Sequence, residues 1–212
     1  MLTVNNLVFS YNEANKFQFP NLNCEKGDHW LILGKSGCGK TTFLHLLGGL
    51  LKAKAGEILL NQTNICTLSE SALDKFRGKN IGIVFQKAHL IKALTVEENL
   101  LTAQYLAGSV QDKSKINNIL KRLNLENKAD SYPSNLSQGE QQRVSIARAL
   151  VNEPAIILAD EPTSSLDDEN AEEVLKLLLD ISESFGSTLI IVTHDARLKS
   201  KFENKIELSK VV

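Results

Sequence analysis

The chain has 212 residues, of which 42% are hydrophobic and 23% are charged, and its formal net charge is −1. This composition is typical of a globular domain with a buried core, and the balanced charge argues against a dedicated nucleic-acid-binding protein. No apolar run approaches the roughly 20 residues that span a bilayer, so we expect no direct membrane insertion.

The cysteines and the N-terminus indicate the compartment. Cys24, Cys38 and Cys66 are an odd number without zinc-binding spacing, which predicts reduced thiols in a cytosolic protein. The first residues, MLTVNNLVFSYN, lack a basic region followed by an apolar run, so we expect no signal peptide. If the protein works at a membrane, another chain must supply the membrane part.

The first 25 residues predict β-hairpin structure, because their apolar positions partly alternate. Residues 55–65 predict a further strand. We expect these strands to form a small antiparallel layer beside the main sheet.

The main sheet is predicted from four short apolar runs that show little alternation, as in strands buried on both faces of a parallel sheet. Helical patterns lie between the runs, notably at residues 41–51 and 169–186. Strands that alternate with helices predict an α/β fold with crossover connections. The four expected strands are residues 30–34, 81–85, 155–160 and 188–194.

Residues 87–140 differ from the rest because they are polar and mostly helical, with the clearest helices at 95–108 and 112–127. We interpret this segment as an inserted helical lobe. The prediction is a single domain over residues 1–212, with a core of residues 1–86 and 141–212 and a helical subdomain of residues 87–140.

The stretch LSQGEQQRVSIARAL, residues 136–150, predicts a capped helix. Ser137 and Glu140 have the spacing of a capping box, in which each side chain bonds the main chain of the other residue. A helix start also attracts anions, because free N–H groups and the helix dipole converge there. The stretch alone leaves open which anion binds.

The stretch GKSGCGKT follows an expected strand and opens an expected helix, which is the context of a glycine-rich phosphate loop. Lys40 is expected to reach the β- and γ-phosphates of a nucleotide, and the Thr41 hydroxyl to ligate Mg²⁺. The alternative is a glycine-rich turn with a surface lysine. The expected nucleotide-binding residues here are Gly34, Lys35, Ser36, Gly37, Cys38, Gly39, Lys40, Thr41 and Thr42, with Cys38 as a small spacer.

Acidic and histidine side chains follow two of the expected strands. Asp160 suits an Mg²⁺ ligand, and Glu161 suits a general base that polarises water. The alternative is that Asp160 and Glu161 are ordinary polar residues, because many strands end in acids simply where they reach solvent. His194 would emerge at the same sheet edge, where it can hydrogen-bond the γ-phosphate and orient the water.

Six motifs in order resemble one family, the nucleotide-binding ATPase subunit of ATP-binding-cassette (ABC) transporters. They are GKSGCGKT, FQ at 85–86, LSQGE, IILADE, SSLD at 164–167 and His194. The resemblance covers essentially the whole chain. It implies a P-loop NTPase core and an ATPase that uses ATP and Mg²⁺. It also implies a transmembrane permease contacted through the helical subdomain, and a peripheral position on the cytoplasmic face of the membrane.

The resemblance also implies roles for single residues. Ser137 and Gly139 would contact ATP held by the phosphate loop of a second copy, as in a head-to-tail homodimer. Tyr11 resembles the aromatic that stacks on adenine, although a hairpin aromatic packed on the core is the alternative. Gln86 resembles a residue that touches Mg²⁺ or its water. The implied catalytic residues are Glu161, His194 and Gln86, the metal ligands are Thr41, Gln86 and Asp160, and Ser165 and Asp167 belong to the loop that crosses the dimer interface.

The sequence departs from the family pattern at Gln138 and Glu140, where glycine and glutamine are usual. The stretch FQKAHLIKALTVEENL resembles the subgroup that serves lipoprotein release and macrolide export. Two alternatives stay open: a soluble ABC ATPase that acts on nucleic acid or ribosomes, and a nucleotide-dependent scaffold of a cell-division-type complex. Glu161 and His194 argue against an inactive site.

Overall fold

The computed structural model describes residues 1–12, 15–164 and 168–209, without the side chains of residues 168–170 and 196. Of the motif SSLD, only Ser164 is described, so Ser165 and Asp167 lie outside the described residues.

A five-stranded parallel sheet has the strand order β10-β4-β9-β8-β7. The four strands predicted from apolar runs are confirmed, and β10 is a fifth that was not predicted. Its segment NKIEL lies at the sheet edge and is only partly buried, so it lacks the continuous apolar run of the others. The strands are β4 (His29–Gly34), β7 (Ile81–Val84), β8 (Ile156–Asp160), β9 (Thr188–Thr193) and β10 (Asn204–Leu208).

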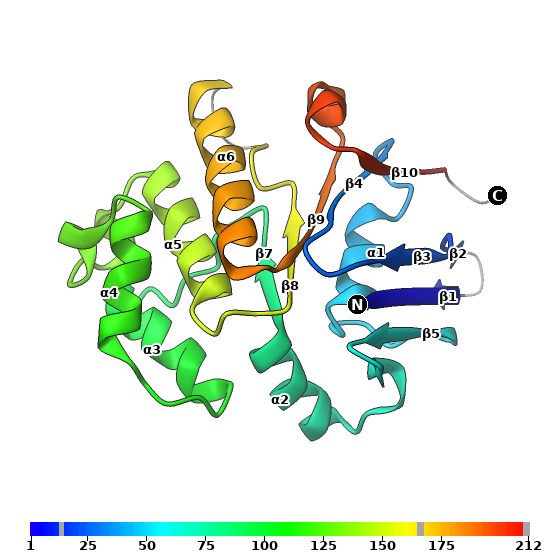
Figure 1. Ribbon diagram of the computed structural model, residues 1–212, viewed down its shortest axis with the longest axis horizontal. Helices are drawn as coiled ribbons and strands as arrows, with labels where there is room; N and C mark the ends of the chain where they lie inside the picture. The colour runs from blue at the N-terminus through cyan, green and yellow to red at the C-terminus, as the bar shows by residue number, and fades with distance from the viewer. Residues whose placement is uncertain (13–14, 165–167, 210–212) are drawn as a thin grey trace.

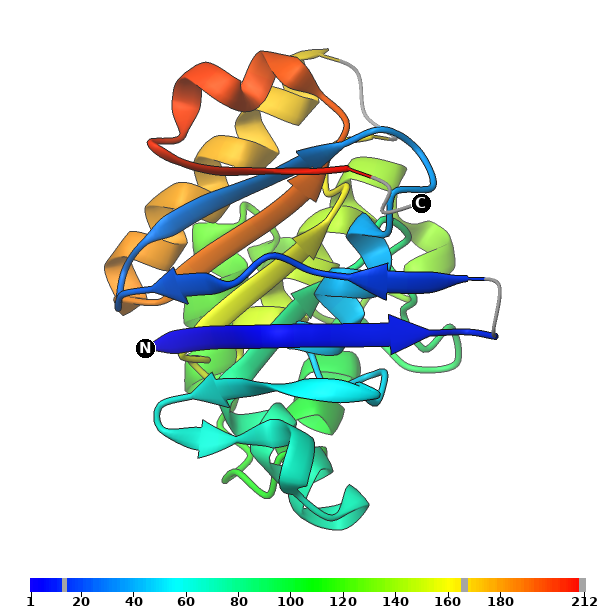
Figure 2. The ribbon, with the colours of Figure 1, turned by 90° about the vertical axis from the view of Figure 1, so that its right-hand side faces the viewer.

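A second, antiparallel sheet has the order β2-β1-β5-β6, with β3 also paired to β1. This confirms the predicted antiparallel layer and the strand expected within residues 55–65. In Figure 2 this sheet lies in front of the parallel one. Its strands are β1 (Leu2–Ser10), β2 (Lys16–Gln18), β3 (Leu22–Cys24), β5 (Ala55–Leu60) and β6 (Thr63–Asn64).

Six α-helices are described, and most match the predicted positions. The first ends at Leu47 rather than Leu51, because Gly48 caps it and Gly49 adopts a positive φ of 63°. The second was missed, because it buries no residue and so has no apolar stripe. The helices are α1 (Lys40–Leu47), α2 (Glu70–Asn80), α3 (Val96–Leu106), α4 (Lys113–Arg122), α5 (Gln138–Leu150) and α6 (Asp168–Phe185). Short 3-10 turns are η1 (Ile65–Thr67), η2 (Glu126–Lys128), η3 (Pro133–Asn135) and η4 (Ala196–Lys201).

The parallel sheet is buried on both faces, as the unbroken apolar runs predicted. In β8, Ile157 and Ala159 belong to one core cluster, whereas Ile156 and Leu158 belong to the other. Figure 1 shows α3 to α6 on one side of this sheet and α1 with the antiparallel layer on the other. Polar groups of the buried strands can therefore reach solvent only at the strand ends.

The helical segment shares its core with the sheet through α5. This helix packs on β7, and both α3 and α4 pack on α5. Leu100 of α3 and Ile116 of α4 belong to the same core cluster as Val84 of β7. No α-helix in the described part of the chain is both long and apolar enough to cross a membrane.

Gly82 generates a stability prediction, because it lets α5 approach β7 very closely. A Cβ atom at Gly82 would lie 2.4 Å from the carbonyl oxygen of Ala149. We expect Gly82→Ala to lower the free energy of unfolding by about 1–3 kcal/mol, because the main chain of α5 at Ala149 or of β7 at Gly82 must shift to make room for the methyl group.

Gly48→Ala is the matched control, because there the nearest atom to the added Cβ would be the flexible methyl Cδ1 of Ile83, at 2.9 Å, and the nearest backbone atom would be at 3.4 Å. Its stability is expected to stay within about 1 kcal/mol of wild type. Urea denaturation of both variants measures the difference, and equal losses would show that the α5–β7 approach is not tight.

Candidate active site

A cavity of about 450 Å³ lies where the loop after β4 meets the carboxyl ends of β7, β8 and β9. Most of the expected nucleotide and catalytic residues meet here, although they come from four segments of the sequence. The lining residues are Phe17, Ser36, Gly37, Gly39, Lys40, Thr41, Thr42, Gln86, Glu161 and His194.

The phosphate-loop segment curls tightly between β4 and α1. Gly39 caps α1 with a φ of 100°, and a Cβ atom there would lie 2.8 Å from the ring of Phe17. The Lys40 ammonium donates to the carbonyl oxygens of Gly34 at 2.8 Å and of Lys35 at 3.3 Å. Lys40 is only 8% exposed, so the alternative of a surface lysine is wrong. Its charge lies inside the loop, where a phosphate oxygen can replace a carbonyl.

Cys38 and Lys35 belong to the loop but do not line the cavity among the described residues. The Cys38 side chain is buried in the core shared with the antiparallel sheet, which fits the expected spacer role. Lys35 is exposed.

Two oxygen atoms meet beside the loop. The Thr41 hydroxyl donates to Oδ1 of Asp160 at 3.2 Å. Burial raises the pKa of Asp160, and the hydrogen bond from Thr41 opposes this rise. A buried carboxylate beside a hydroxyl is the kind of oxygen donor set that Mg²⁺ prefers, and a bound cation would relieve the cost of burying the charge. The residues present therefore fit a magnesium ion.

Glu161 and His194 are in direct contact. Nδ1 of His194 lies 2.9 Å from Oε1 of Glu161, and the Thr193 hydroxyl donates to Oε2 at 3.2 Å. Glu161 has a positive φ of 48°, which is uncommon for a residue with a side chain. Its side chain is only 13% exposed. This carboxylate is therefore held in the cavity wall, and does not simply face solvent at a strand end.

Gln86 follows β7 and lines the same cavity. Its Nε2 donates to the Ser164 hydroxyl at 3.1 Å, and that hydroxyl donates to the carbonyl oxygen of Glu161 at 3.1 Å. Gln86 is thereby tied to the main chain of the residue expected to be the base.

Tyr11 has features of both interpretations offered for it. The residue is 60% exposed, as stacking on a base would require. It also packs edge-on against Phe9, with 4.7 Å between the two ring centroids, and its hydroxyl lies 3.1 Å from the hydroxyl of Thr42. Phe17 of β2, which the sequence analysis missed, lines the cavity itself. Only the folding of β2 against the loop brings Phe17 there, so no local sequence signal reveals it.

Ser137 caps α5 as predicted. Its hydroxyl accepts from the Glu140 N–H at 3.2 Å, and Glu140 Oε2 accepts from the Ser137 N–H at 2.7 Å. Among the described residues, neither Ser137 nor Gly139 lines the cavity beside the phosphate loop. Because α5 joins parallel strands β7 and β8, it begins at the sheet edge that carries the cavity.

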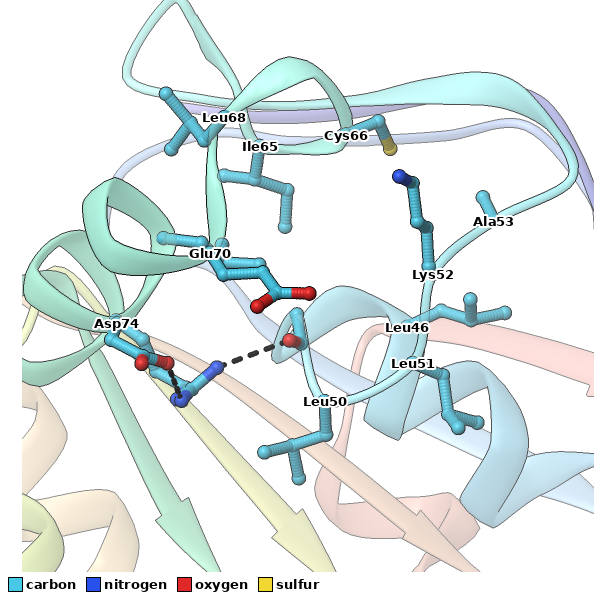
Figure 3. Close-up of a pocket in the computed structure, with 13 residues that line it drawn as sticks. Leu46, Leu50, Leu51, Lys52, Ala53, Ile65, Cys66, Leu68, Glu70 and Asp74 are labelled. Atoms are coloured by element: carbon cyan, nitrogen blue, oxygen red, sulfur yellow. Dashed lines mark hydrogen bonds and ion pairs between the residues drawn. The ribbon is translucent and has the colours of Figure 1, made fainter.

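A second cavity, of about 380 Å³, lies between the end of α1, η1 and α2 (Figure 3). Leucine side chains such as Leu46, Leu50 and Leu51 form much of its wall, and the Glu70 carboxylate turns into it. None of the expected site residues is among its described lining.

Comparisons with known proteins show which chains and structures this chain is similar to. A profile of the family described as "ABC transporter" matches residues 17–164. The lipoprotein-releasing system ATP-binding protein LolD of Buchnera aphidicola subsp. Schizaphis graminum is 42% identical over 89% of this chain and 83% of its own length. The ABC transporter ATP-binding protein YtrE of Bacillus subtilis is 42% identical over 93% and 86%. A dimeric, post-hydrolysis structure of the cassette MJ0796 with ADP and Pi matches with a TM-score of 0.88, at 35% identity, over 99% of this chain and 95% of that one.

The capping residue Glu140 generates a pH prediction. The Lys128 ammonium at 2.9 Å, with the Ser137 N–H, lowers the pKa of Glu140 from 4.5 to about 2. A depressed folded-state pKa means that this stabilisation is present above pH 4.5 and is lost as the pH falls toward 2.

Glu140→Gln keeps an acceptor for the Ser137 N–H but removes the charge. We expect it to be less stable than wild type at pH 7, with a difference that shrinks as the pH falls below 4.5. Urea titrations at several pH values measure this. A difference that stays constant with pH would contradict the ion pair.

Proposed function

Because this chain belongs to the ABC transporter family and is an ATP-hydrolysing subunit of it, we propose that it powers a membrane transporter through ATP-driven, head-to-tail pairing of two copies. In this mechanism ATP draws two subunits together, and hydrolysis lets them part. The observation that carries the proposal is the separation of Ser137 and Gly139 from their own phosphate-loop cavity, at the same edge of the sheet.

The chemistry assigned to the cavity follows from its geometry. Glu161 orients and polarises the attacking water as general base, and His194, 2.9 Å away, holds the Glu161 carboxylate and faces the γ-phosphate. The Lys40 ammonium and the loop N–H groups bind the phosphates, while Tyr11 stacks on the base. Thr41, Asp160 and Gln86 would hold Mg²⁺. When bound, that ion neutralises charge on the phosphate oxygens.

The capped start of α5 completes the pocket of the other copy. In Ser137, the side-chain oxygen already accepts a hydrogen bond, so its hydroxyl proton can be donated to a phosphate oxygen. Free N–H groups at Gln138 and Gly139 and the helix dipole favour the same anion. Capping and nucleotide binding therefore use one structure, with the two copies forming a homodimer.

We assign the membrane partner to the helical subdomain, residues 87–140. A cavity of about 730 Å³ lies between the segment after β7 and the start of α5. It supports this assignment, because its lining residues come both from the helical subdomain and from the adjoining core residues Gln86, Gln141 and Gln142. Relatives named for lipoprotein release favour a lipoprotein or similar lipid-linked cargo for this chain too. The subunit would then work on the cytoplasmic face, bound to a permease, without nucleic acid.

The role of Glu161 gives a kinetic prediction. Glu161→Gln keeps the shape and the hydrogen-bonding capacity but removes the base, so we expect turnover to fall by about 100-fold or more while ATP binding persists. Phosphate release and nucleotide binding measure the two effects, and size-exclusion chromatography with Mg-ATP should show an accumulated dimer. Turnover at the wild-type rate would disprove the assignment.

Pairing in trans gives a second prediction. Ser137→Asp keeps a good N-cap but places a negative charge against the partner's γ-phosphate, so this variant should lose turnover. Lys40→Ala should also lose turnover, because the phosphate loop of that copy lacks the ammonium that binds the phosphates. A mixture should regain activity, because a mixed dimer has one site with an intact loop facing an intact turn.

Ser137→Asn serves as the matched control, since it caps the helix without the charge. Its turnover should fall less than that of Ser137→Asp. If the mixture of Ser137→Asp and Lys40→Ala hydrolyses ATP no faster than either variant alone, the pockets do not use residues of a second copy.

A further inference from the structure

The buried glutamine Gln142 lies one and a half turns into α5 and is only 3% exposed. Its Nε2 donates to two main-chain carbonyl oxygens, of Pro162 at 3.2 Å and of Phe85 at 3.4 Å. Pro162 directly follows Glu161, and Phe85 directly precedes Gln86. One side-chain amide therefore joins the main chain beside both residues.

These contacts close a ring around the catalytic end of the cavity. From Gln142 the ring runs to Phe85 and Gln86, whose Nε2 bonds the Ser164 hydroxyl. That hydroxyl bonds the carbonyl oxygen of Glu161, and the main chain then leads through Pro162 back to Gln142. The separation of Gln86 and Glu161 is therefore set by hydrogen bonds from α5 as well as by the sheet.

We propose that Gln142 is a positioning residue that fixes Gln86 relative to Glu161. Through Gln142, the distance between these two residues depends on the position of the start of α5. The inference rests on the proposed function for Gln86 and the Ser137 turn. Gln142 is not among the described residues that line the phosphate-loop cavity, and it acts through the main chain at Phe85 and Pro162.

Arg148 supports the same segment from the other half of α5. Its guanidinium donates to the carbonyl oxygens of His89 at 2.6 Å and of Ala88 at 2.8 Å. His89 has a positive φ of 45°, a backbone conformation that needs support from its surroundings. Gln142 and Arg148 thus hold both ends of the segment from Phe85 to His89 against one helix. The end of that helix is itself fixed against β7, at Gly82.

The test uses Gln142→Met, which keeps the length and shape of the side chain but cannot donate. In the full-length chain we expect kcat for ATP hydrolysis to fall at least about tenfold, while KM for Mg-ATP changes less than about threefold. In a Gln86→Ala background the same substitution should slow turnover less than about twofold further, because Gln142 acts through Gln86.

Gln104→Met is the matched control. Gln104 is also a buried helical glutamine, and its Oε1 accepts from the Asp112 N–H at 2.9 Å, away from the cavity. This variant should keep kcat within about twofold of wild type even if its thermal stability falls. An equal loss of kcat in Gln104→Met would show that the loss in Gln142→Met reflects a general loss of stability, and this would overturn the inference.

Two further outcomes separate the inference from the proposed function. If Gln86→Ala itself leaves turnover intact, the role proposed for Gln86 falls and the positioning role falls with it. If Gln86→Ala loses turnover but Gln142→Met does not, or if their effects add fully, only the positioning role is overturned. Should Gln142→Met fail to fold, Arg148→Lys takes its place, since lysine keeps the charge but cannot bond both carbonyls in fork geometry.

Discussion

The parallel sheet is buried on both faces, and the arrangement of the active site depends on that burial. Alternate residues of β8 and β9 enter two different cores, so these strands can present polar side chains only where they end. All paired strands in this sheet run in the same direction, which brings those ends to one edge. The phosphate loop, Glu161 and His194 share a cavity for this reason, and Asp160 lies beside it, against Thr41.

The charges at this edge are buried but paired with hydrogen-bonding groups. Lys40 is satisfied by loop carbonyls and Asp160 by the Thr41 hydroxyl. Burying a charge is unfavourable unless such partners are present, so the fold keeps these groups ordered and close to where a triphosphate would lie. The raised pKa of Asp160 reflects the same cost. Groups held in this way need little rearrangement to stabilise the charge of phosphoryl transfer.

One helix, α5, links the parts of the site that the sheet does not gather. Its start carries the capped anion-binding turn at Ser137, its middle bonds the main chain beside Gln86 and Glu161, and its end packs against β7 at Gly82. The helices α3 and α4 both pack on α5, which itself packs on β7. A displacement of the helical segment would therefore reach the catalytic residues through α5.

Local patterns in the sequence determined the phosphate loop, the capping box of Ser137 and Glu140, and the strands β4, β7, β8 and β9, because each depends on residues close together in the chain. The edge strand β10 and the helix α2 were not predictable in this way, since neither buries a continuous or periodic apolar face. Only the tertiary structure decided that Phe17 closes on Gly39 and that Gln142 joins Phe85 to Pro162. Those contacts join residues distant in the sequence, and packing of whole elements, rather than any local pattern, brings them within hydrogen-bonding or van der Waals distance.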